Sequence, residues 1–91
     1  KLNYNVEIGR AAHINGNVVF GKNIKIWRIV HLSTFPNQTL TLEDNVKILW
    51  GDIIKGNIVI GENSTIESSV NMTGSDEFPL RIGKNVLDES G

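Results

Sequence analysis

The chain has no cysteine in its 91 residues, only two prolines, and no excess of charge of either sign. The absence of cysteine excludes disulfides and thiolate metal sites, and it leaves the redox compartment open. The formal net charge is −1, with acidic and basic residues interspersed, so composition does not indicate binding to nucleic acid or to an anionic membrane. No apolar run has membrane-spanning length, and no signal-peptide pattern is found. We expect a cytoplasmic protein with neither nucleic acid nor membrane as a partner.

The length of the chain limits the number of domains and the size of the core that it can form. Ninety-one residues are enough for one domain, and a compact globule of that size buries a modest fraction of its chain. Elongated repeats and oligomers are therefore open possibilities. We expect a single domain over residues 1–91. Because the chain opens on Lys1 instead of Met and its pattern begins in mid-repeat at Leu2, we also expect it to be processed or a fragment.

What the sequence does contain is a six-residue period of aliphatic or aromatic side chains. A helix would show spacings of three and four, and a half-buried strand would alternate without interruption, so a strict six indicates short strands separated by turns. Asn or Gly recurs between the repeat positions, and both residues reach left-handed backbone angles at low cost. The repeat positions are Leu2, Ile8, Ile14, Phe20, Ile26, Leu32, Leu42, Ile48, Ile54, Ile60, Ile66, Met72 and Ile82.

Three such turns close a triangular coil of 18 residues. Two steps of ten residues interrupt the period, one after Leu32 and one after Met72. Both residues lie on the same face of the triangle, so the extra residues predict two loops at one corner, Ser33 to Gln38 and Thr73 to Phe78. The sequence therefore predicts an all-β parallel β-helix of about five coils with two four-residue insertions. The alternatives are a right-handed β-helix and a β-sandwich. The register places one set of asparagines at a single corner: Asn23, Asn45, Asn63 and Asn85.

The two histidines occupy the same place in the repeat. His13 and His31 are eighteen residues apart and should stack on adjacent coils. They are candidates for half of a metal site, and His31 is a candidate general base at a subunit boundary. A catalytic zinc normally has three protein ligands, and the column continues with Ile53 and Asn71, which supply none. The alternative is two partly exposed polar residues on a strand face, and we predict no complete metal site.

Aromatic and basic side chains gather near one corner. Trp27 and Trp50 fall there on neighbouring coils, with Arg28 beside them, and these three are candidate substrate-binding residues. The turn positions of this corner hold Ala11 and Ile29 where other corners hold Asn, so we expect a different turn shape. An exposed aromatic and cationic patch is typical of an interface, and a small core covered by a loop is the alternative.

No catalytic constellation can be read from the residues alone. Asp52 falls at an inward position, where it could face a widened turn, and we do not predict a catalytic role for it. The Gly-x-Asn motifs form turns, and no phosphate-loop motif is present. Whether the protein is an enzyme is left open at this point.

Two stretches carry a resemblance, Asn57 to Ile66 and Val70 to Val86. They resemble hexapeptide-repeat acyltransferases and are most similar to the O-acetyltransferases of bacterial polysaccharide clusters. The resemblance implies a left-handed β-helix and, in the full-length protein, acetyl transfer from acetyl-coenzyme A to a sugar hydroxyl. In those enzymes this region is the N-terminal stack of coils, and the catalytic histidine and the coenzyme groove lie further along the chain. The resemblance therefore implies that residues 1–91 are the N-terminal part of a longer protein, a scaffold segment without a cofactor. The families resembled are trimers, which together with the aromatic corner predicts a parallel homotrimer.

Two other interpretations compete with this one. Ser75 to Glu77, followed by Ile82 to Val86, is also similar to γ-class carbonic anhydrases. Against that family, Asp88 replaces an expected aliphatic residue and the arginine that usually precedes the aspartate is absent. The metal histidines of that family would also lie further along the chain. The third interpretation is a non-catalytic repeat module that spaces or assembles other parts.

Overall fold

The structure is a computed structural model that describes residues 5–75, 80–83, 85 and 87–88. Within these ranges the chain forms short strands in three parallel sheets and has no helix. Sheet A contains β1 (Val6–Ile8), β4 (Ile24–Ile26), β7 (Lys47–Ile48), β10 (Thr65–Ile66) and β13 (Leu87–Asp88). Sheet B contains β2 (His13–Asn15), β5 (His31–Ser33), β8 (Ile53–Gly56) and β11 (Asn71–Gly74). Sheet C contains β3 (Val18–Phe20), β6 (Leu40–Leu42), β9 (Ile58–Ile60) and β12 (Leu80–Ile82).

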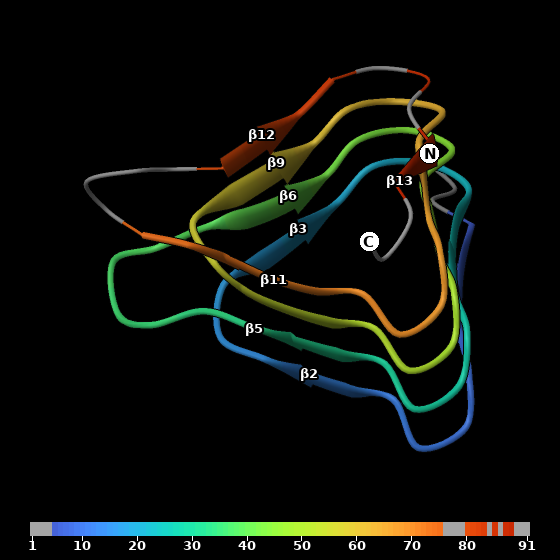
Figure 1. The fold of residues 1–91 in the computed structure, drawn as a ribbon, viewed down its shortest axis with the longest axis horizontal. Coiled ribbons are helices and arrows are strands. Elements are labelled where there is room, and N and C mark those ends of the chain that lie inside the picture. Colours follow the sequence, from blue (N-terminus) through green and yellow to red (C-terminus); the bar gives the residue numbers. More distant parts are fainter. Residues whose placement is uncertain (1–4, 76–79, 84, 86, 89–91) are drawn as a thin grey trace.

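The three sheets are the walls of a triangular β-helix (Figure 1). Each strand pairs with the strand one full turn away, 18 or 22 residues along the chain, as in the pairing of Ile8 with Ile26 and of Ile26 with Ile48. In the view of Figure 1 the chain runs clockwise from β3 to β5 to β6, and the fainter, more distant turns are the N-terminal ones. The coil is therefore left-handed, opposite to the usual sense of parallel crossover connections.

The described part of the coil makes about four turns, fewer than the five expected from the sequence. Sheet A has five strands there, and sheets B and C have four each. The count is lower because it covers only the described residues. The first repeat position, Leu2, and the last three residues of the chain, 89–91, fall outside them.

The repeat positions from Ile26 to Met72 lie in the core, as the period predicts. Side chains two residues apart on a strand point to the same side, so the three-residue strands of sheets A and C direct their two ends inward. In sheet B, β2 and β5 direct their central residues, Ile14 and Leu32, inward. Stacked turns then bury these aliphatic side chains in columns, which stabilises the coil by removing apolar surface from water. The buried apolar residues are Ile24, Ile26, Val30, Leu32, Leu40, Leu42, Val46, Ile48, Ile54, Ile58, Ile60, Ile66, Val70 and Met72.

Asparagines form a ladder at the corner between sheets C and A, which confirms the predicted register. Asn23, Asn45, Asn63 and Asn85 all have left-handed backbone angles, with φ between 58° and 64°. The Asn23 side-chain amide donates a hydrogen bond to Asn45 Oδ1 at 3.2 Å, and that of Asn45 donates to Asn63 Oδ1 at 2.9 Å. Asparagine therefore provides both the backbone geometry and a side-chain contact between turns.

The first predicted loop is present between sheets B and C. It spans residues 34–39, between β5 and β6, and projects to the left of the triangle in Figure 1. The buried Gln38 side chain closes it, because its Oε1 accepts a hydrogen bond from the backbone N–H of Phe35 at 3.0 Å. Of the second predicted loop, Thr73 to Phe78, Thr73 and Gly74 belong to strand β11, and residues 76–78 lie outside the described residues.

Candidate functional site

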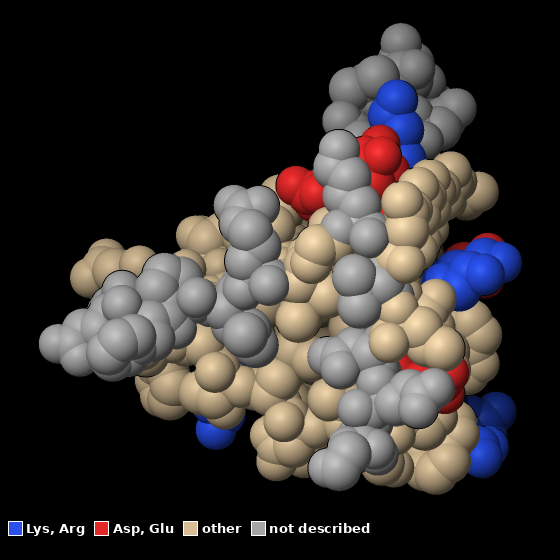
Figure 2. All heavy atoms as spheres, turned by 45° about the horizontal axis from the view of Figure 1, so that its top comes forward, with Lys and Arg blue, Asp and Glu red and all other residues tan. Residues whose placement is uncertain are grey.

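Charged side chains are dispersed over the surface. On the face shown in Figure 2, acidic and basic side chains occur in small groups, some of them side by side, among uncharged surface. The outward column of sheet A contains Glu7, Lys25, Lys47 and Thr65. Together with the asparagine corner, this column lines an open groove of about 490 Å³. With only two lysines, one of them paired in register with Glu7, the groove does not form a strongly cationic surface.

The structure brings the two histidines together. His13 on β2 pairs in register with His31 on β5, and their imidazole rings stack with centroids 4.8 Å apart and an angle of 23° between planes. Both side chains are exposed. The same outward column continues with Ile53 and Asn71, as the sequence predicts. No group of three possible metal-ligating His, Asp or Glu side chains occurs among the residues that the structure describes.

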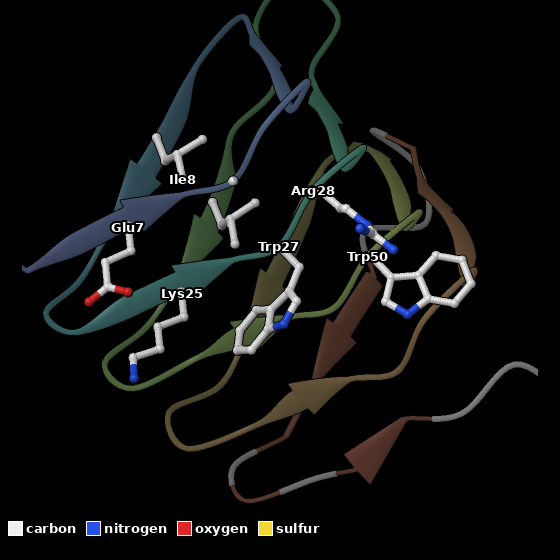
Figure 3. Close-up of a pocket in the computed structure, with 8 residues that line it drawn as sticks. Glu7, Ile8, Lys25, Trp27, Arg28 and Trp50 are labelled. Carbon is white, nitrogen blue, oxygen red and sulfur yellow. The ribbon is translucent and has the colours of Figure 1, made fainter.

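The tryptophans lie at the corner between sheets A and B, which we call the aromatic corner (Ile8, Trp27, Arg28, Ile29 and Trp50). The exposed fractions of the Trp27, Trp50 and Ile29 side chains are 38%, 47% and 49%. An open hollow of about 520 Å³ lies over this corner and is bounded by Ile8, Trp27, Arg28 and Trp50 (Figure 3). Arg28 and Trp50 belong to one column, because the Gly51 N–H donates to the Arg28 carbonyl at 3.1 Å, and Figure 3 shows the Arg28 side chain extending towards the Trp50 indole.

The turns of the aromatic corner differ in composition from those of the asparagine corner but not in backbone shape. Ala11, Ile29 and Ser69 have φ of 61°, 61° and 63°, and Gly51 has φ of 77°. The left-handed conformation is uncommon for residues other than glycine and asparagine, and for a β-branched residue such as isoleucine it is an outlier. The coil geometry imposes it, because each turn must bend here for the next strand to stack.

The close approach of successive turns fixes the backbone of the aromatic corner. A Cβ atom added at Gly9 would lie 2.6 Å from both the backbone nitrogen of Arg28 and the carbonyl carbon of Trp27. The Gly9 N–H also donates to the Ile26 carbonyl at 2.7 Å, and the Trp27 N–H donates to the Ile48 carbonyl at 2.8 Å. The indoles therefore project from a backbone held on both sides by neighbouring turns.

Asp52 is the fully buried carboxylate of this region. It lies in the inward column of the turn after the aromatic corner, and its Oδ1 accepts a hydrogen bond from the Val70 N–H at 2.8 Å. Its carbonyl accepts a hydrogen bond from the His31 N–H at 2.8 Å. Asp52 thus joins three successive turns. A carboxylate enclosed in this way is placed to organise backbone groups, and it does not face the hollow.

Trp27, Arg28 and Trp50, which occupy outward positions of the repeat, are three of the eight residues that line the hollow. The other five are Glu7, Ile8, Gly9, Lys25 and Ile26. The period places Ile8 in the interior, yet it is half exposed, because it belongs to the first described turn. Ile29, which the sequence indicates only as a turn residue, is half exposed at the same corner and does not line the hollow. A run of apolar side chains at outward positions of one corner is the signal that could have found it.

Comparison of the chain with protein-family models, with curated proteins and with solved structures gave no significant match. In the part of the chain that the structure describes, no helix is long and apolar enough to cross a membrane. The established features are therefore the β-helix, the stacked histidines and the exposed aromatic corner.

Proposed function

We propose that this chain is the β-helical scaffold segment of a hexapeptide-repeat acyltransferase and that it assembles through the aromatic corner. In the full-length protein the reaction is acetyl transfer from acetyl-coenzyme A to a sugar hydroxyl, carried out by residues outside this segment. The segment itself binds no cofactor. It acts in the cytoplasm, with neither nucleic acid nor membrane as a partner.

The observation that carries this proposal is the six-residue period on a left-handed coil with its extra residues confined to one corner. Inward positions are aliphatic in turn after turn, and Asn supplies the left-handed angles between sheets C and A. Such a coil is rigid, because each turn hydrogen-bonds to both neighbours.

The aromatic corner supports assembly. Three apolar side chains (Trp27, Ile29 and Trp50) are exposed at this corner, beside Arg28, and Ile8 of the inward column is half exposed. Tryptophan, other aromatic residues and arginine are enriched at protein interfaces, where their large surfaces leave water on association. A homotrimer packed with parallel coil axes would bury this edge in each copy.

Acetyl transfer is tested by comparing two polypeptides. The 91-residue chain and the full-length product of its gene are incubated with acetyl-coenzyme A and a panel of sugars, and products are followed by mass spectrometry. We expect the full-length protein to acetylate a sugar and the 91-residue chain to be inactive. Turnover by the 91-residue chain that is lost in His31→Ala would contradict the proposal, because the catalytic base would then lie inside the segment.

Two further outcomes distinguish the competing functions. Hydration of carbon dioxide by the zinc-loaded full-length protein, without acetyl transfer, would favour the γ-class carbonic anhydrase interpretation. A full-length protein that neither binds acetyl-coenzyme A nor hydrates carbon dioxide would favour the non-catalytic assembly module. Loss of assembly on substitution of the tryptophans is common to all three functions and is therefore measured separately.

A further inference from the structure

The stacked pair of histidines on sheet B has a geometry that the proposed function does not use. His13 and His31 extend from equivalent positions of two parallel strands, on the outer face of the sheet. Their rings are almost parallel, with centroids 4.8 Å apart. In a parallel in-register pair the two side chains leave the sheet in the same direction, so the two rings lie side by side.

The imidazole nitrogens are available to a ligand from solvent. Within the part of the chain that the structure describes, no hydrogen bond or ion pair involves either ring, and both side chains are exposed. The outward neighbours on the adjacent strand β8 are Ile53 and Lys55. The Lys55 ammonium lies over the Phe35 ring, 5.7 Å from its centroid. No carboxylate among the outward residues of these strands competes for the histidines.

We propose that His13 and His31 together bind one transition-metal ion through a nitrogen of each imidazole, with Cu(II) preferred. Metal–nitrogen bonds of about 2.0–2.1 Å place two adjacent ligand nitrogens roughly 3 Å apart. The rings are exposed, so rotation about their side-chain bonds can turn them out of the stack, bring one nitrogen of each to that separation and aim both lone pairs at one ion. Water completes the coordination, because the described outward residues supply no third imidazole or carboxylate.

The strand ladder holds the two ligands in place before the metal arrives. The His13 N–H donates to the Val30 carbonyl at 2.8 Å, and the His31 N–H donates to the Asp52 carbonyl at 2.8 Å. Slippage by one residue would turn the inward Ile14 and Leu32 towards solvent, so the register is fixed by the core. Binding therefore requires only side-chain adjustment, which favours chelation over capture by a single ring.

The ligand set decides which ions bind. Imidazole is a borderline ligand suited to Cu(II), Ni(II) and Zn(II), and affinities for divalent ions rise to Cu(II) and fall at Zn(II). Copper(II) also accepts two nitrogens and several waters in a tetragonal arrangement. Magnesium and calcium prefer oxygen ligands and serve as negative controls. With two protein donors, we expect Cu(II) affinity in the micromolar range.

The test is isothermal titration of the tag-free chain, with a blocked N-terminal amine, using Cu(II), Ni(II), Zn(II) and Mg(II) at a pH of about 7.5, where free imidazole is largely neutral. We expect one Cu(II) per chain, weaker Ni(II) and Zn(II) binding, and no Mg(II) binding. His13→Asn and His31→Asn should each weaken Cu(II) binding by about tenfold or more, because either substitution ends chelation. Asn is the matched replacement, since Asn71 already occupies this column.

A second variant keeps the proposal falsifiable. Combining His13→Asn with Ile53→His moves the pair one turn along the same column, opposite His31, and should restore Cu(II) affinity to within a few-fold of the parent chain. Circular dichroism checks that every variant keeps its β-structure. Three results would each overturn the intrachain chelate. The first is binding of two Cu(II) ions per chain, and the second is a single variant that loses one Cu(II) site and keeps the other unchanged. The third is a stoichiometry that depends on protein concentration.

Discussion

The Asp52 carboxylate accepts a hydrogen bond from the backbone N–H of Val70 at 2.8 Å, from one turn of the coil to the next. The two residues occupy the same inward column, 18 residues apart, and every other described member of that column is apolar (Ala12, Val30 and Val70). Asp52 is completely buried. The hydrogen bond to the backbone of the following turn therefore explains how a polar side chain can occupy this otherwise apolar column.

Replacing Asp52 tests this contact. Asp52→Ala removes an acceptor from a buried N–H, and a buried group left without its partner costs about 1–3 kcal/mol, so the free energy of unfolding should fall by that amount. Asp52→Asn keeps a side-chain oxygen in place and should cost less. Urea denaturation followed by circular dichroism gives both values. If the alanine variant were as stable as the parent chain, the hydrogen bond would have no structural role.

Two substitutions of Asn45 separate the contribution of its left-handed backbone angle to stability from that of its side-chain hydrogen bonds. Asn45 has φ of 64° and hydrogen-bonds to Asn23 and Asn63. Asn45→Gly keeps the left-handed turn and removes the ladder contacts, which should cost about 1 kcal/mol because the contacts are exposed. Asn45→Ala loses the contacts and adds the left-handed penalty, about 1 kcal/mol more. Thermal unfolding should rank the variants in that order, and a glycine variant less stable than the alanine variant would contradict the explanation.

Two glycines give a matched pair of substitutions. A Cβ atom at Gly56 would overlap the carbonyl oxygen of Gly74 on the next turn, and φ there is 102°. At Gly51, with φ of 77°, the nearest atom would be the Ser69 hydroxyl at 3.4 Å, an ordinary contact. Gly56→Ala should therefore separate the turns and cost about 3 kcal/mol or more, whereas Gly51→Ala should cost only the backbone penalty of about 1 kcal/mol. Equal effects on the unfolding midpoint would show that turn packing is not the limiting factor.

The fold was predictable because three independent signals agree in the sequence. The six-residue period identified the inward columns, the asparagines identified one corner, and the steps of ten identified the loop corner. Each signal reflects a local requirement: burial of alternate side chains, a left-handed angle, or extra chain length. The described part makes about four turns instead of five, because residues 1–4 and 89–91 lie outside it.

The site was less predictable, since it depends on features that have no sequence period. The stacking of His13 on His31 follows from the register, but the ring orientation depends on rotamers. The exposure of Ile8 follows from its place in the first described turn, which the repeat does not distinguish from the others. The left-handed angle at Ile29 opposes the residue's own preference and arises from the coil closing around it.

Replacing Ile29 should stabilise the folded monomer and weaken its self-association. Its left-handed conformation is strained, by about 1–2 kcal/mol for an ordinary residue, and its side chain is half exposed at the aromatic corner. Ile29→Asn should therefore raise the free energy of unfolding of the dilute, monomeric chain by about 1 kcal/mol while weakening self-association. Val19→Asn, which replaces an exposed apolar residue on the outer face of sheet C, is the control and should leave association unchanged. Destabilisation by Ile29→Asn under dilute conditions would contradict the assignment of strain.

Assembly through the aromatic corner is measured most directly by sedimentation equilibrium of the 91-residue chain at micromolar concentration, together with the Trp27→Ser/Trp50→Ser variant. The mass of one chain is 10.1 kDa, so a trimer would have three times that mass, about 30 kDa. We expect the parent chain to sediment as the trimer, with tryptophan fluorescence shielded from a solvent quencher, and the variant to sediment as a folded monomer. A parent chain that is monomeric, with both tryptophans fully open to the quencher, would contradict the account.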